Sequence, residues 1–138
     1  MKKGLFILSI FAMVFVLTGC GNKPSTLTCK QSVSSVDVQL TANFEGKKVK
    51  AMGIVYTMDL SKYSDSTIEA LGKQDYCSSV QKAISQFTLV DCHQEIADKQ
   101  LLVTAGVDMS KIKESDTIGS PDETKKELES QGYTCTLE

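Results

Sequence analysis

Val36-Asp37-Val38-Gln39-Leu40-Thr41-Ala42-Asn43-Phe44 is the stretch that decides the fold, because apolar and polar residues alternate along it without a break. Successive side chains of a strand point to opposite faces, so this pattern predicts one buried face and one wet face. The polar turn Glu45-Gly46-Lys47-Lys48 follows and leads into a second apolar stretch, Val49 to Met58. Together these segments predict an antiparallel hairpin.

The second strand of this hairpin carries apolar residues on both faces. If even-numbered residues of the first strand lie opposite odd-numbered residues of the second, the buried face takes Val49, Ala51, Gly53 and Val55. The other face then holds Met52, Ile54, Tyr56 and Met58 beside Gln39, Thr41 and Asn43. We call Met52, Ile54, Tyr56 and Met58 the apolar stripe. Such a stripe is covered by another element, redirected by a bulge at Gly53, or used as a binding surface.

Two capping patterns predict helices after the hairpin. The first, Ser66-Thr67-Ile68-Glu69, is typical of a capping box with Ser66 as the N-cap. Apolar residues follow it at helical spacing with one interruption, so we expect one kinked helix or two short ones that run to about Gln86. The second pattern, Ser120-Pro121-Asp122-Glu123, predicts a helix that Gly132 ends.

The other strands are expected at Thr26 to Ser32, Leu89 to Ile96, Leu101 to Asp108 and Tyr133 to Leu137. The resulting order, β-β-β-α-β-β-α-β, predicts an α+β fold in which two or three helices pack on a mostly antiparallel sheet. A signal-peptide helix is expected to precede this fold. Residues 26–138 are enough to form a single domain with a buried core.

The N-terminal segment predicts a lipoprotein signal peptide over residues 1–19. Lys2 and Lys3 precede an apolar run that is shorter than the ~20 residues of a membrane-spanning helix. The run ends in Leu17-Thr18-Gly19-Cys20, which resembles the lipobox of bacterial lipoproteins. We therefore expect Cys20 to receive diacylglycerol and fatty acyl chains such as palmitate, and residues 20–25 to form a tether. Two or more chains hold a protein stably, so the expected location is the extracytoplasmic face of the cell membrane.

Four cysteines lie beyond Cys20, and an even number in an exported domain predicts two disulfide bonds. Three connectivities are compatible with the sequence. We expect Cys29 to pair with Cys135, which ties the opening strand to the closing one. Cys77 then pairs with Cys92, which pins a helix to the strand that follows it.

Composition narrows the set of partners. Removal of Lys2 and Lys3 leaves thirteen of fifteen lysines against seventeen acidic residues, a net charge of −4, which argues against nucleic acid. The chain contains no arginine and no tryptophan, so it lacks the usual bidentate anion clamp and sugar-stacking platform. The partner is expected to be a protein or a small molecule.

One triplet, Asp91-Cys92-His93, has reactive side chains. Adjacent strand residues point to opposite faces, so Cys92 and His93 do not form a nucleophile–base pair locally. The strand is expected to place Val90, Cys92 and Ile96 on one face, and Leu89, Asp91, His93 and Glu95 on the other. Asp91, His93 and Glu95 are better explained as a solvated face than as metal ligands. No catalytic residue, metal site or cofactor is expected, since phosphate-binding glycine loops and a Gly-x-Ser-x-Gly turn are also missing from the sequence.

Four stretches of the chain resemble the YehR-like family of small bacterial lipoproteins. They are the lipobox at residues 17–20, the turn at 45–49, the strand end Val103 to Lys111, and the helix-to-strand joint Lys125 to Tyr133. The resemblance covers most of the mature chain and implies a membrane-anchored α+β domain without established catalytic residues. The extra cysteines depart from the pattern expected of that family.

The sequence thus favours a non-catalytic extracytoplasmic binding or interaction module whose contact surface is the apolar stripe. One alternative is a thiol- or metal-dependent envelope enzyme that uses Cys92 and His93. Another is a solute-capturing accessory lipoprotein, although one small domain lacks the two-lobed cleft that usually encloses a solute.

Overall fold

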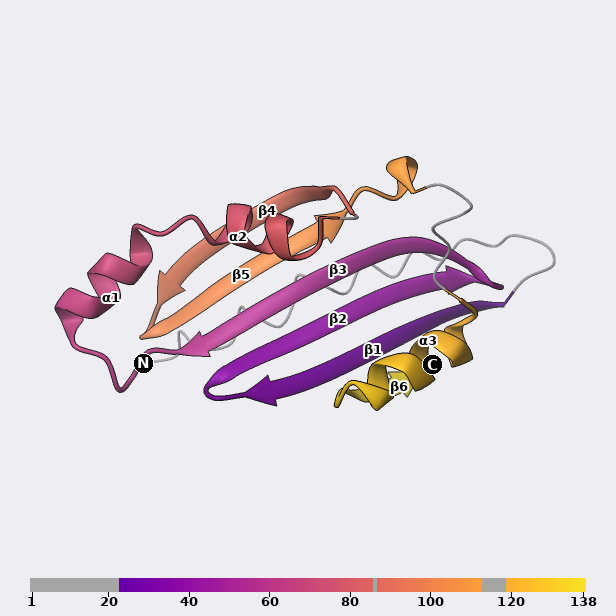
Figure 1. The fold of residues 1–138 in the computed structure, drawn as a ribbon, viewed down its shortest axis with the longest axis horizontal. Coiled ribbons are helices and arrows are strands. Elements are labelled where there is room, and N and C mark those ends of the chain that lie inside the picture. Colours follow the sequence, from indigo (N-terminus) through magenta and orange to yellow (C-terminus); the bar gives the residue numbers. More distant parts are fainter. Residues whose placement is uncertain (1–22, 86, 113–118) are drawn as a thin grey trace, which may run out of the picture.

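The structure, a computed structural model, describes residues 23–85, 87–112 and 119–138. Within these ranges six strands form one sheet in the order β4-β5-β3-β2-β1-β6, and every neighbouring pair is antiparallel (Figure 1). The strands are Pro24–Val33 (β1), Val36–Glu45 (β2), Lys48–Asp59 (β3), Leu89–Ala97 (β4), Gln100–Val107 (β5) and Thr134–Leu137 (β6). The predicted α+β fold with a mostly antiparallel sheet is confirmed.

The described ranges contain three α-helices, of which the second and third lie on one face of this sheet and the first lies beyond the end of β4 (Figure 1). They are Asp65–Gly72 (α1), Tyr76–Ala83 (α2) and Pro121–Ser130 (α3), and a short 3-10 helix, Met109–Lys111 (η2), follows β5. Helix α2 packs over β4 and β5, whereas α3 packs over β1 and β6 at the opposite side of the sheet. The expected signal peptide, residues 1–19, and the lipidation site Cys20 lie outside the described residues.

The helix boundaries correct one predicted cap. The N-cap of α1 is Ser64, whose hydroxyl accepts a hydrogen bond from Thr67 N, so the predicted N-cap Ser66 is wrong by two residues. Ser66 instead exchanges a hydroxyl hydrogen bond with Ser64. The capping box of α3 is confirmed: Glu123 N donates to Ser120 Oγ, and Ser120 N donates to the Glu123 carboxylate.

The predicted register of the first hairpin is also wrong, and a β-bulge is the reason. Phe44 pairs with Val49 as predicted, but the next pair is Asn43 with Ala51, so Lys50 is an extra residue on β3. One extra residue moves every later side chain of the strand to the other face. From Ala42 to Val36, even-numbered residues of β2 therefore face even-numbered residues of β3.

A second irregularity lies in β4, where the pairing shifts between Val90 and His93. Asp91 there has a φ of 53°, a left-handed conformation typical of bulges. As a result, Val90 lies opposite Gly106 on the face that carries no helix, and Leu89 lies opposite Val107. The predicted grouping of Val90 with Cys92 is therefore wrong.

Two hydrophobic cores occupy the helical face of the sheet. The first lies under α3, and its buried residues are Leu27, Cys29, Ala42, Phe44 and Cys135, with Leu128 and Tyr133 packed against them. The second lies under α1 and α2, and its buried residues are Leu60, Leu101 and Val103, with Tyr56, Met58, Tyr76 and Val80 among those packed against them. We call them the α3 core and the α2 core.

Each core contains one disulfide bond, and the predicted pairing is confirmed. Cys29 is bonded to Cys135 across directly opposed positions of β1 and β6, 106 residues apart in the chain. Cys77, on α2, is bonded to Cys92, on β4, 15 residues away. The first bond joins the two ends of the described chain, and the second joins a helix to the sheet edge.

The expected tether is shorter than predicted. Pro24 and Ser25 already pair with Glu45 and Phe44, so β1 starts before Thr26. Lys23 O accepts a hydrogen bond from Gly46 N at 3.3 Å. The N-terminal entry to the domain therefore lies at the end of the sheet that carries the β2–β3 turn.

Candidate functional site

The bulge in β3 changes where the apolar stripe lies. Met52, Ile54, Tyr56 and Met58 share a face with Val36, Val38, Leu40 and Ala42, not with Gln39, Thr41 and Asn43. Ile54 is 4% exposed, Met52 packs against the α3 core, and Tyr56 and Met58 pack against the α2 core. The stripe is thus part of the helical face. The prediction that it is an exposed binding surface is wrong.

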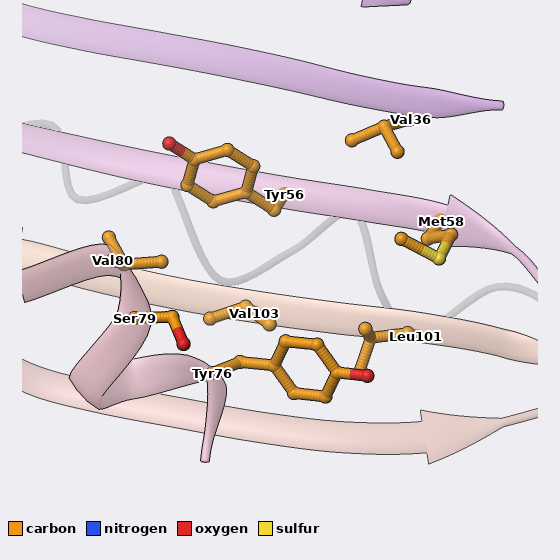
Figure 2. Close-up of a pocket in the computed structure, with 8 residues that line it drawn as sticks. All are labelled: Val36, Tyr56, Met58, Tyr76, Ser79, Val80, Leu101 and Val103. Carbon is orange, nitrogen blue, oxygen red and sulfur yellow. The ribbon is translucent and has the colours of Figure 1, made fainter. Parts of the chain in front are cut away.

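Two residues of the stripe nevertheless line a cavity between α2 and the sheet. The cavity has a volume of about 110 Å³. Its lining residues are Val36, Tyr56, Met58, Tyr76, Ser79, Val80, Leu101 and Val103 (Figure 2). We call it the α2 cavity. Its floor comes from β2, β3 and β5, and its roof comes from α2.

Two glutamines and one disulfide fix α2 above this cavity. Gln94, on β4, accepts hydrogen bonds from Tyr76 N at 2.9 Å and Cys77 N at 3.4 Å, so it caps the unpaired amides at the start of the helix. Its amide nitrogen donates to Gln74 O at 2.7 Å. The Cys77–Cys92 bond acts on the same turn of the helix. The roof of the cavity is therefore held in place by groups on β4.

The second glutamine, Gln81, ties the other end of α2 to the start of β4. Its side chain donates to Phe87 O at 2.7 Å and accepts from Leu89 N at 2.8 Å. Both ends of the helix are thus bonded to the segment that leads into the sheet. The cavity beneath it is preformed, because its roof is fixed at both ends.

Tyr76 lines the α2 cavity through its ring and carries a buried hydroxyl group. Tyr76 Oη is buried and has no hydrogen-bond partner among the described residues. Figure 2 shows its ring extending from α2 over the floor of the cavity towards Leu101. Burial raises the pKa of the Tyr76 hydroxyl, so the group is neutral at physiological pH.

Tyr56 contributes a second phenol on the sheet side of the cavity. Burial raises the pKa of its hydroxyl, and the neighbouring Tyr133 raises it further. Tyr133 belongs to the α3 core, so Tyr56 lies where the two cores approach one another. The surface that these residues present to the cavity is therefore apolar, and none of the lining residues is charged.

The residues of the predicted thiol or metal chemistry lie apart from this cavity. Cys92 is disulfide-bonded and presents no thiol. His93 lies on the face without helices, where its Nε2 is 3.8 Å from the Glu95 carboxylate and both side chains are largely exposed. Within the described ranges, no group of three or more His, Cys, Asp or Glu side chains is placed to hold a metal ion.

A second hollow of about 190 Å³ lies between the end of α1 and β4. Gly72, Gln94, Glu95, Ile96 and Leu101 line it. Gln94 already uses its side-chain oxygen and nitrogen to hold α2. The side chain of Gln94 is therefore not free to bind a ligand in this hollow.

Sequence reasoning missed the groups that build the α2 cavity. Gln94 and Gln81 carry no motif, because a glutamine in a strand or helix normally predicts only solvent exposure. Tyr76 lies on the face of α2 that packs against the α2 core. Only the tertiary structure shows that its hydroxyl is buried without a partner among the described residues.

None of the helices in the described part of the chain is long and apolar enough to cross a membrane.

Comparison with known proteins shows the fold alone. No protein-family model matches this chain, and no curated protein matches it. An NMR structure of a protein from Streptococcus pneumoniae TIGR4 is similar, with a TM-score of 0.52, and the match covers 84% of this chain and 86% of that chain. The two sequences are 12% identical, so the likeness concerns the fold.

Proposed function

We propose that this protein is a lipid-anchored, extracytoplasmic binding module without catalytic activity. The lipobox Leu17-Thr18-Gly19-Cys20 supports the anchor, and two disulfides fit an oxidising compartment outside the cytoplasm. A relationship with the YehR-like lipoproteins is part of the proposal and depends on the four sequence stretches described above. The partner is a protein or a small molecule, not nucleic acid.

The observation on which the binding role depends is the preformed α2 cavity. Small-molecule and side-chain sites are concave and mostly apolar, with a few polar groups that fix orientation. The α2 cavity is concave and its surface is apolar, which supports this role. The cysteine of the alternative enzyme hypothesis is instead consumed in the Cys77–Cys92 disulfide, which favours binding over thiol catalysis.

The position of the cavity suits a tethered binder. The chain enters β1 beside Gly46, whereas Val36 and Met58 lie near the other end of the same strands. About ten residues of β3 separate the two ends, which at ~3.3 Å per residue is roughly 30 Å. A domain held through residue 20 would then present the cavity away from the lipid headgroups.

The anchor is tested by metabolic labelling with an alkyne-bearing fatty acid in a bacterial host. The full-length chain should incorporate the label and sediment with membranes, and the Cys20→Ser chain should do neither. Equal labelling of both chains, or no labelling of either, would contradict the anchor.

The binding role is tested in the same cells with a photoreactive phenylalanine analogue. At Met58, which lines the cavity, irradiation should add a discrete mass to the protein. Thr57 is the matched control, because it is the adjacent residue of β3 and points to the face without helices. Adducts that are equal at both positions, or missing at both, would contradict a binding role for the cavity.

A further inference from the structure

The two disulfide bonds differ in how well the protein shields them from solvent. Cys29 and Cys135 are 0% and 8% exposed and lie among the buried residues of the α3 core. Cys77 and Cys92 are only half-buried. A thiol breaks a disulfide by direct attack on one of its sulfur atoms, so the rate depends on access to that atom. The Cys77–Cys92 bond is therefore the one that a thiol in solution reaches more readily.

The sheet topology gives the same order of access. Cys29 belongs to β1, which has a strand on each side, so both flanks of this residue are covered. Cys92 belongs to β4, whose outer side pairs with no strand of the described chain. An attacking thiol can therefore approach the Cys77–Cys92 bond from this side without separating any pair of strands.

Reduction of the Cys77–Cys92 bond acts on α2 and leaves the strand pairing intact. The two cysteines are 15 positions apart, and the loop between them contains most of α2 and its connection to β4. Without the bond, α2 keeps its packing and the hydrogen bonds of Gln94 and Gln81. The helix then opens locally more often than the rest of the domain. The roof of the α2 cavity is thus the part of the molecule that reduction loosens.

Gln94 keeps the two thiols near one another after reduction. It lies two residues after Cys92 on β4, and its side-chain oxygen accepts hydrogen bonds from Tyr76 N at 2.9 Å and Cys77 N at 3.4 Å. Neither bond involves sulfur, so reduction does not remove them. Because Cys77 stays beside β4, the disulfide can form again when the surroundings become oxidising. The bond is thus local in its effect and reversible.

We propose that the Cys77–Cys92 disulfide is a reversible redox switch that controls the α2 cavity. The reductant is a protein or small molecule with two thiols. One of its thiolates attacks a sulfur of the bond and forms a mixed disulfide, which the second thiol then resolves. Two electrons and two protons pass to the protein, so Cys77 and Cys92 become thiols while the reductant becomes a disulfide. The oxidised form holds the roof over the cavity, and the reduced form releases it.

This proposal deepens the proposed function by naming the regulation of its site. It rests on that function only for the role of the α2 cavity in binding. The selective reduction and the release of α2 depend on the two disulfides alone.

Time-resolved reduction of the full-length chain in lipid nanodiscs tests the switch, with dithiothreitol as the probe. Samples are quenched in acid, alkylated with N-ethylmaleimide and measured by peptide mass spectrometry. Cys77 and Cys92 should become alkylated together, about tenfold or more faster than Cys29 and Cys135, since the exchange depends on access. Hydrogen exchange of the partly reduced chain should then accelerate about tenfold or more in α2 and stay unchanged in α3.

A variant tests the role of Gln94 in re-forming the bond. After dithiothreitol is removed, oxidised glutathione should close the Cys77–Cys92 bond of Gln94→Ala about fivefold more slowly than that of the unaltered chain, the scale of one hydrogen bond. Glu95→Ala is the matched control, because Glu95 is the next residue of β4 and its side chain is largely exposed. It should leave the rate of closure unchanged.

The photoreactive analogue at Met58 tests the control of the cavity. In cells, the adduct at Met58 should fall severalfold in the Cys77→Ala/Cys92→Ala chain, because the roof is no longer pinned over the floor. The background at Thr57, on the face without helices, should stay the same in both chains.

Four results would overturn the proposal: equal reduction rates for the two disulfides, unchanged exchange in α2 after reduction, unchanged closure in Gln94→Ala, or an equal Met58 adduct with and without the bond. These failures are distinguishable from failure of the proposed function. A Met58-specific adduct together with equal reduction rates would keep the binding module and reject the switch. Selective reduction with no Met58-specific adduct in either chain would keep the redox step and reject the binding role.

Discussion

The α3 core and the α2 core are built on the same sheet face but are closed in different ways. In the α3 core, Cys29 and Cys135 are 0% and 8% exposed and belong to opposed strands, so backbone pairing and the disulfide act together. In the α2 core, the disulfide and glutamine side chains instead join a helix to a strand. The disulfide between two strands thus lies in the α3 core, whereas the disulfide between a helix and the sheet holds the roof of the α2 cavity.

The largest expected effect comes from the disulfide of the α3 core. The Cys29→Ala/Cys135→Ala double variant should lose about 4 kcal/mol of unfolding free energy, because the bond closes a loop of more than one hundred residues. Urea unfolding monitored by circular dichroism measures this change. If this loss is smaller than the loss for the Cys77–Cys92 bond, loop length does not explain the difference between the two disulfides.

The disulfide of the α2 core should have a smaller and more local effect. The Cys77→Ala/Cys92→Ala variant should lose about 3 kcal/mol, as expected for a loop of about 15 residues. Hydrogen exchange should accelerate in α2 before it does in α3. Uniform acceleration in both helices would contradict the view that this bond mainly holds the roof of the cavity.

Gln94 should account for a further part of the helix attachment. Gln94→Ala removes the side-chain bonds to the Tyr76 and Cys77 amides and should cost about 1–2 kcal/mol. Glu95→Ala is the matched control, because Glu95 is the next residue of β4 and its side chain is largely exposed. Thermal unfolding of the two variants measures the difference. Equal losses would show that the hydrogen bonds of Gln94 add no stability beyond the general effect of a substitution in β4.

The smallest expected effect is on the pH dependence of stability, and it involves only the capping box of α3. Hydrogen bonds from the Ser120 backbone and hydroxyl lower the pKa of Glu123, whose ordinary value is 4.5. Because the pKa is lower in the folded chain, the stabilisation is complete above the unfolded value and is lost as the pH falls through the folded value. Carboxyl NMR titration should show the low pKa, and Ser120→Ala, which keeps the backbone bond and removes the hydroxyl, should raise it only part of the way towards 4.5. A Glu123 pKa that is not lowered in the unmodified chain would contradict the capping-box assignment.

The sequence predicted the elements well because alternation and capping residues are local signals. The order of the elements along the chain and the capping box at Ser120 follow from such patterns, and of the two possibilities left open after β3, one kinked helix or two short ones, the structure has two short helices. Both cysteine pairs are also as predicted, although the sequence is compatible with three connectivities.

The candidate site was harder to predict because it depends on irregularities that have no local signal. One extra residue, Lys50, turned the apolar stripe inward, and nothing in its neighbours distinguishes a bulged strand from a regular one. In β4, the irregularity at Asp91 likewise changed the faces on which Leu89 and Val90 lie. The cavity arises only after α2 is bonded to Gln94, a contact between residues 18 positions apart.

The first strand has a mechanical consequence for an anchored protein. All ten residues of β1 pair with β2, and four of them also pair with β6. Hydrogen bonds of antiparallel strands run perpendicular to the chain, so a pull on Lys23 along β1 loads them all at once and does not open them one by one. The Cys29–Cys135 bond couples β6 to the same strand. A domain hung from its N-terminal end would therefore resist shear at the strand that bears the load.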